Sequence, residues 1–162
     1  MLIQHLHDFI TNAAIVVPTV SWLTAQILKA IIDAAVNKTF RVSRLFGDGG
    51  MPSGHSATVM SLATIVGLTD PAGFAGMPFA IAMMFAIVVM HDATGVRREA
   101  GKQARMILSM LDVLSDYIAE KDTKIKDEKL KVLVGHTPLQ VLCGALLGVA
   151  IAIGYYFAFV KI

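Results

Sequence analysis

Long apolar segments restrict the fold of this chain more than any other feature. Four of them, at about 9–35, 54–69, 72–97 and 137–160, approach or exceed the roughly 20 residues that a helix needs to cross a bilayer. Hydrophobic residues make up 56% of the 162 residues and charged residues only 16%, and the mean hydropathy is +0.67. Soluble domains contain about 25% charged residues. We therefore expect a single all-α domain, a polytopic membrane bundle of about four transmembrane helices.

The second segment, 54–69, differs from the others because it is short and rich in Ala, Ser, Thr and Gly. Such residues let helices approach closely and form hydrogen bonds across their interfaces. We expect this segment to pack inside the bundle rather than to face lipid.

Two counts exclude other classes of protein. The single cysteine, Cys143, excludes a disulfide framework and a cysteine-based zinc site, and we expect neither a metal nor a cofactor. The net charge of +2 is too small to favour nucleic acid as a partner.

The basic residues are distributed very unevenly between the connections. Of the 14 Lys and Arg, three lie between the first and second segments and nine lie from Arg97, the last residue of the third segment, to Lys131, whereas the N-terminus before Phe9 and the turn at 69–71 have none. The positive-inside rule places both basic connections in the cytoplasm. We therefore expect a multi-pass protein of the cell's inner membrane, with both termini outside.

The connection from about 99 to 134 has an organisation of its own. Apolar residues recur at the spacing of one helix face, at Ile107, Leu111, Leu114 and Ile118. This pattern predicts an amphipathic helix that packs on the base of the bundle or on another copy of itself. It is followed by a charged linker, Glu120–Lys131, in which nine of twelve residues carry charges of both signs.

Three polar clusters lie at the expected cytoplasmic ends of the apolar segments. The first, 47–56, opens the second segment, the next, 91–103, closes the third, and the last, 135–140, opens the fourth. Taken singly, they are explained as a helix cap, as basic contacts to anionic lipid head groups and as a structural histidine. Because the topology brings all three to one membrane face, we interpret them as one site.

The residue types in these clusters suit a phosphate ligand. Backbone amides of Ser53, Gly54 and His55 at a helix start attract anions, and the side chain of His55 adds a titratable proton donor. Arg97 and Arg98 can hold phosphate oxygens with two hydrogen bonds each. In addition, Asp92 and an arginine one turn later can satisfy each other, and His136 and Gln140, four residues apart, share a helix face.

Together these motifs resemble a known family. Gly-Gly-Met-Pro-Ser-Gly-His-Ser-Ala, Asp-Ala-Thr-Gly-Val-Arg-Arg-Glu-Ala-Gly-Lys-Gln-Ala and Gly-His-Thr-Pro-Leu are similar to motifs of the divergent branch of the type 2 phosphatidic acid phosphatases, which are related to the vanadium-dependent haloperoxidases. The resemblance extends from about Ala25 to Gly148. It implies a helical membrane bundle and a lipid phosphate or pyrophosphate as substrate.

The resemblance also implies roles for individual residues. His136 would attack phosphorus and form a phosphohistidine, and His55 would protonate the leaving oxygen. Phosphate oxygens would be held by Lys29, Ser53, Gly54, Arg97 and Arg98. Supporting positions would be Asp92, Gln103 and Gln140, the last of which replaces an aspartate that the parent signature has four residues after its nucleophilic histidine.

Two functions follow from this reading. The first is a membrane phosphohydrolase that acts on a polyprenyl or glycerolipid phosphate at the cytoplasmic face. The alternative, which Gln140 favours, is a non-catalytic protein that binds or transports lipid phosphates. Gly144 and Gly148 in the last segment allow close helix contact, either within one chain or in a homodimer.

Overall fold

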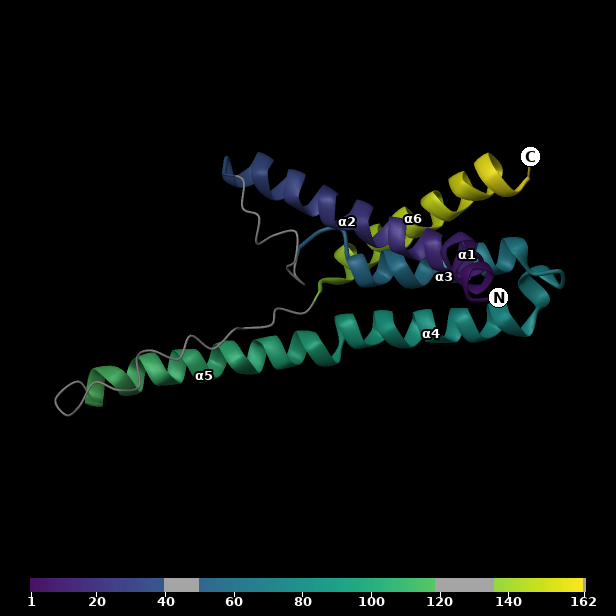
Figure 1. Cartoon of the computed structure of the whole chain (residues 1–162). Coiled ribbons are helices and arrows are strands. Elements are labelled where there is room, and N and C mark those ends of the chain that lie inside the picture. The colour runs from purple at the N-terminus through teal and green to yellow at the C-terminus, as the bar shows by residue number, and fades with distance from the viewer. Residues whose placement is uncertain (40–49, 119–135, 162) are drawn as a thin grey trace.

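The computed structural model of the protein describes residues 1–39, 50–118 and 136–161, and all regular structure in these ranges is helical (Figure 1). The charged linker Glu120–Lys131, the first residues of the 47–56 cluster and the side chain of Arg97 lie outside this description. The helices are α1 (Leu2–Thr11), α2 (Ala13–Asn37), α3 (Gly54–Thr69), α4 (Met77–Thr94), α5 (Val96–Ile118) and α6 (Pro138–Tyr155), with short turns η2 (Gly73–Ala75) and η3 (Tyr156–Val160). The expected all-α membrane bundle is confirmed.

Within the described residues, three helical stretches are long and apolar enough to cross a membrane: Ala13–Asn37, Met77–Leu111 and Pro138–Val160. The first begins later than expected, because Asn12 separates α1 from α2 and its side chain accepts a hydrogen bond from the amide of Ala14 at 2.9 Å. The stretch that contains α4 also begins late, at Met77, because the residues before it form η2.

The fourth helix of the bundle, α3, is shorter than a full span. It has 16 residues, which at about 1.5 Å per residue cover roughly 24 Å. It contacts α2, α4 and α6, and half of its residues are buried, as the small residues of this segment predict (Figure 1). The bundle is therefore built around α3, with the longer helices outside it.

Two glycines of α6 set its distance from α3. A Cβ atom on Gly144 would overlap the carbonyl oxygen of Ser53, and one on Gly148 would overlap that of Ala57. The helices approach so closely that only a hydrogen atom fits at these two positions. The glycine spacing allowed a close helix contact either within one chain or in a homodimer. The structure shows the contact within one chain.

Helix α5 runs on from α4 after Gly95 and extends beyond the rest of the bundle (Figure 1). Among the described elements, α5 packs only against α4. The apolar face of α5 predicts packing on the base of its own bundle or on another copy of the chain. The described residues do not show the first, because α5 continues past the other helices (Figure 1), and the second stays a prediction. Its apolar residues Ile107, Leu111 and Leu114 are exposed.

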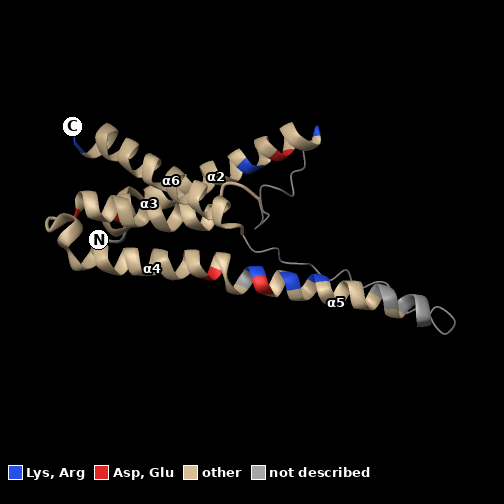
Figure 2. Cartoon of the chain, turned by 180° about the vertical axis from the view of Figure 1, so that it is seen from behind, with Lys and Arg blue, Asp and Glu red and all other residues tan. Residues whose placement is uncertain are grey.

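The basic residues of the described chain gather toward one end of the molecule. Figure 2 shows Lys and Arg in the last part of α2 and the first half of α5, whereas the opposite end of the bundle carries Lys161. The start of α3, the end of α4 and the start of α6 all lie toward the basic end.

Candidate functional site

The three polar clusters meet at one end of the bundle, where backbone hydrogen bonds join their elements. The amide of Ser53, just before α3, donates to the carbonyl of Gln140 in α6 at 3.0 Å. The amide of His136, just before α6, donates to the carbonyl of Ala93 in α4 at 3.1 Å. Each bond links two clusters that are far apart in the sequence.

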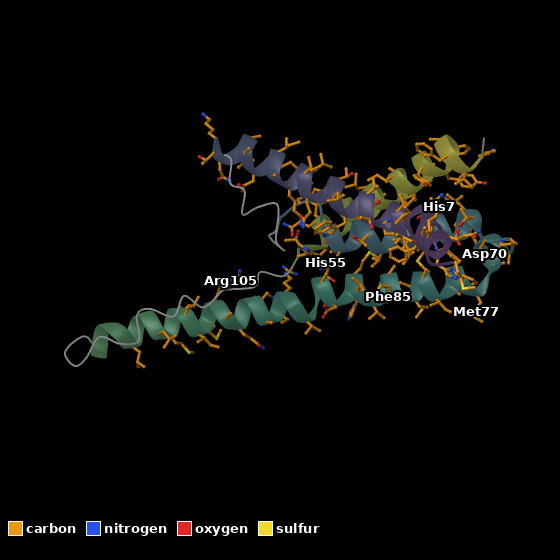
Figure 3. The ribbon with its side chains drawn as sticks, viewed as in Figure 1. His7, His55, Asp70, Met77, Phe85 and Arg105 are labelled. Carbon is orange, nitrogen blue, oxygen red and sulfur yellow. The ribbon has the colours of Figure 1, made fainter. Side chains whose placement is uncertain are left out.

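Two histidines face each other at this junction. The ring centroids of His55 and His136 are 6.3 Å apart, and the ring planes are inclined by 53°. His136 is buried, with 4% of its surface exposed, and His55 is half-buried near the start of α3 (Figure 3). Two imidazoles at this separation can both reach one small tetrahedral group.

The start of α3 is held by its own serines. The hydroxyl oxygen of Ser53 accepts hydrogen bonds from the amide of Ser56 at 3.4 Å and from its hydroxyl at 3.0 Å. The Ser53 amide donates to α6 and is therefore not available to an anion. The predicted amide donors that remain at this helix start are those of Gly54 and His55. Amides in the first turn of a helix have no partner within that helix and are suited to an anion.

Lys29 reaches this helix start from α2. Its ammonium is buried, with the residue 5% exposed, and donates to the amide oxygen of Gln26 at 2.9 Å. The same Nζ atom lies 3.6 Å from the position that a Cβ on Gly54 would occupy. Burying an ammonium is costly unless polar partners or an anion compensate for the lost water. The structure thus places a positive charge beside the amides of α3.

The sequence analysis did not single out Gln26 and Trp22, which accompany Lys29 on the same face of α2. Atoms Cδ1 and Nε1 of Trp22 lie 3.4 and 3.7 Å from the same Cβ position on Gly54. Trp22, Gln26 and Lys29 follow the i, i+4, i+7 spacing of one helix face. Counting this spacing back from Lys29 in the sequence would have identified Gln26 and Trp22 as its neighbours on that face.

Other predicted residues lie elsewhere. Arg98 and Gln103 are exposed on α5, and their neighbour Lys102 pairs with Glu99 at 2.7 Å. Asp92 is partly buried in the last turns of α4, next to the carbonyl that receives the His136 amide. The structure therefore brings Lys29 and the two histidines to the site but leaves Arg98 and Gln103 on a surface.

Gln140 has a structural task in α6. Its side-chain oxygen accepts a hydrogen bond from the backbone amide of Thr137 at 3.0 Å. The Thr137 hydroxyl oxygen accepts one from the backbone amide of Gln140 at 3.3 Å. This reciprocal pair is a capping box that closes the first turn of the helix. In the described ranges, no three His, Cys, Asp or Glu residues gather so that they could hold a metal ion.

Comparison with known proteins places this arrangement in a family. The sequence matches the divergent PAP2 family over residues 10–151. This chain belongs to that family. It is also 36% identical, over 158 residues, to the uncharacterized membrane protein YuiD of Bacillus subtilis (strain 168), a match that covers 93% of this chain and 99% of YuiD. No solved structure matches significantly. The family resemblance that the sequence motifs indicated is confirmed, and the divergent PAP2 motifs hold the paired histidines.

Proposed function

We propose that this divergent PAP2 protein is a membrane phosphohydrolase that removes phosphate from a lipid phosphate or pyrophosphate. The observation that carries the proposal is the pair of imidazoles, His55 and His136, with ring centroids 6.3 Å apart beside the start of α3. The buried Lys29 supplies positive charge at the same helix start. A nucleophile, an acid and an anion-binding corner are the parts that phosphoryl transfer to a histidine requires.

In the proposed reaction, a nitrogen of His136 forms a bond to phosphorus while the bond from phosphorus to the lipid oxygen breaks. His55 gives its proton to that leaving oxygen, so the lipid departs as an alcohol, or as a monophosphate when the substrate is a pyrophosphate. Lys29 and the amides of Gly54 and His55 stabilise the negative charge on the other phosphate oxygens. Water, deprotonated by His55, then attacks the phosphohistidine and releases inorganic phosphate.

We also propose that the site faces the cytoplasm and takes its substrate from the inner leaflet. The two histidines lie at the starts of α3 and α6, and these starts are toward the end of the molecule that carries the basic residues of α2 and α5 (Figure 2). Under the positive-inside rule this end is cytoplasmic. A polyprenyl or glycerolipid phosphate in the inner leaflet would present its phosphate at that level.

The second candidate is a protein that binds or transports lipid phosphates without hydrolysing them. The capping role of Gln140 favours it, because the amide oxygen is bonded to Thr137 and carries no charge that could stabilise an imidazolium. In serine proteases, replacing the aspartate that supports the catalytic histidine by its amide lowers turnover by about 10⁴.

Phosphate release separates the two candidates. The purified protein in detergent is incubated with phosphatidic acid or a polyprenyl diphosphate, and inorganic phosphate is measured. Hydrolysis predicts release that disappears in His136→Ala and a radiolabelled, acid-labile phosphoprotein that forms only with His136 present. Saturable lipid binding without release or labelling would support the binding protein instead.

A further inference from the structure

Trp22 has a donor group beside the start of α3. Its Nε1 atom lies 3.7 Å from the Cβ position of Gly54, and Nζ of Lys29 lies 3.6 Å from the same point. The indole N–H and the ammonium therefore approach one small volume from the same helix. Glycine at position 54 keeps this volume open, since a side chain there would fill the space between the two donors.

Within the described part of the chain, the indole N–H of Trp22 makes no hydrogen bond. Tryptophan N–H groups that lie in apolar surroundings usually find an acceptor. Here the group stands beside a buried ammonium and a helix start, which are both positive, so the acceptor that suits it is an anion. Phosphate oxygens have the charge and the lone pairs to accept hydrogen bonds from the indole N–H, from the ammonium and from the amides of the helix start.

The ring of Trp22 also faces outward. Its side chain is partly open, with the residue 38% exposed, and its neighbours Leu23 and Ile27 are 48% and 53% exposed on a helix that can cross the membrane. Seven residues separate Trp22 from Lys29, so Trp22 lies about 10 Å farther along α2 toward its N-terminal end, away from the basic end of the helix. The indole therefore lies on the hydrocarbon side of the ammonium, where the first carbons of a lipid would pass.

From this geometry we propose that Trp22 is a substrate-contacting residue that selects lipid-linked phosphate over soluble phosphate. Its N–H donates to a phosphate oxygen bound beside Lys29 and Gly54, and its ring packs against the first carbons of the lipid chain. This inference rests on the part of the proposed function that makes a lipid phosphate the ligand. It does not require that the protein hydrolyses that ligand.

Kinetics of two variants separate the contributions of the N–H group and the ring. The substrates are phosphatidic acid in detergent micelles and the soluble ester p-nitrophenyl phosphate. Trp22→Phe removes the N–H and should raise KM about tenfold for both, the loss expected for one hydrogen bond to a charged group. Trp22→Ala should raise KM by about a further tenfold for phosphatidic acid alone, since only that substrate has a chain to bury.

A neighbouring variant serves as the control for these kinetics. Leu23→Ala alters an exposed apolar side chain one residue away and should leave both KM values unchanged. Wild-type KM values in both Trp22 variants, with hydrolysis intact, would overturn the assignment of Trp22 and leave the proposed function standing.

Fluorescence tests binding without hydrolysis, because Trp22 is the one tryptophan of the chain. The His136→Ala protein, in nanodiscs of neutral lipid, is titrated with phosphatidic acid, diacylglycerol or inorganic phosphate. We expect a saturable change in emission with phosphatidic acid, none with diacylglycerol, a far weaker one with inorganic phosphate, and loss of the response when Lys29→Met is added.

The two experiments together identify which proposal fails. A saturable response to phosphatidic acid in a protein that hydrolyses no lipid phosphate would remove the phosphohydrolase and keep Trp22 as a ligand contact. Equal responses to phosphatidic acid and inorganic phosphate would overturn selection for lipid. The absence of any response would overturn the contact itself.

Discussion

The rings of His55 and His136 lie 6.3 Å apart, although one opens the second apolar segment and the other opens the fourth. The contact depends on two backbone hydrogen bonds, from Ser53 to Gln140 and from His136 to Ala93, which fix the starts of α3 and α6. If the two histidines act on opposite sides of one phosphorus, their roles are separable by the choice of leaving group.

His55→Ala should slow the first step, transfer of phosphate to His136, far more with phosphatidic acid than with p-nitrophenyl phosphate. An alkoxide leaves only when it is protonated, whereas nitrophenolate leaves unaided, and a general acid contributes about 10²–10⁴ in rate. His136→Ala should abolish both reactions. The burst of diacylglycerol or nitrophenol in the first turnover measures this step apart from the later attack by water, in which His55 also acts, and an equal loss of both bursts in His55→Ala would contradict its role as the acid.

The packing of α3 against α6 yields a prediction about stability. Gly148→Ala should lower the free energy of unfolding by about 1–3 kcal/mol, because the added methyl meets the backbone of Ala57 and α6 must move away. Gly154→Ala is the matched control, since nothing lies within 4 Å of its Cβ position. Thermal unfolding in detergent compares them, and equal shifts in both variants would contradict the close contact.

The helical bundle and the meeting of polar clusters could be predicted from the sequence because both depend on averages over many residues. Long apolar runs require membrane helices, the small residues of 54–69 require a buried helix, and the distribution of basic residues brings the clusters to one end. None of these inferences depends on where a single side chain points.

The details that the sequence analysis missed depend on such directions. Trp22 lies in an apolar segment, where a tryptophan is expected to face lipid, and only its approach to Gly54 shows that its N–H faces the site. The apolar stripe of α5 predicts a covered face but not what covers it. The Thr137–Gln140 pair carries a capping signature, yet the resemblance led us to interpret Gln140 as support for a histidine.

Substitutions of Gln140 therefore test whether its side chain caps α6 or supports His136. Gln140→Leu should lower the free energy of unfolding by about 0.5–2 kcal/mol, the usual cost of losing a helix cap, while changing turnover only a few-fold. Gln140→Glu keeps an acceptor for the Thr137 amide and should keep wild-type stability. Turnover that collapses in Gln140→Leu at unchanged thermal stability would show instead that the side chain serves His136.

Lys29→Met should lower both stability and phosphate affinity. The residue is 5% exposed and its ammonium donates to Gln26, so an apolar side chain leaves that buried amide oxygen without its donor and the protein should unfold at a lower temperature. Phosphate affinity should fall by about 10–100-fold, because a charge-assisted hydrogen bond is lost. Lys38→Met, at the exposed end of α2, is the control that should alter neither quantity.

The orientation in the membrane is tested by labelling single cysteines in a Cys143→Ala background with a reagent that does not cross membranes. Thr69 is exposed at the end of α3 away from the histidine pair, and Ser109 is exposed on α5 beyond its basic first half. Twelve basic residues in two connections fix the expected orientation, because translocating them would oppose the positive-inside rule. On intact cells Thr69→Cys should therefore label at once, whereas Ser109→Cys should label only after the cells are opened. The reverse order would place the histidine pair outside and would limit its substrates to lipids of the outer leaflet.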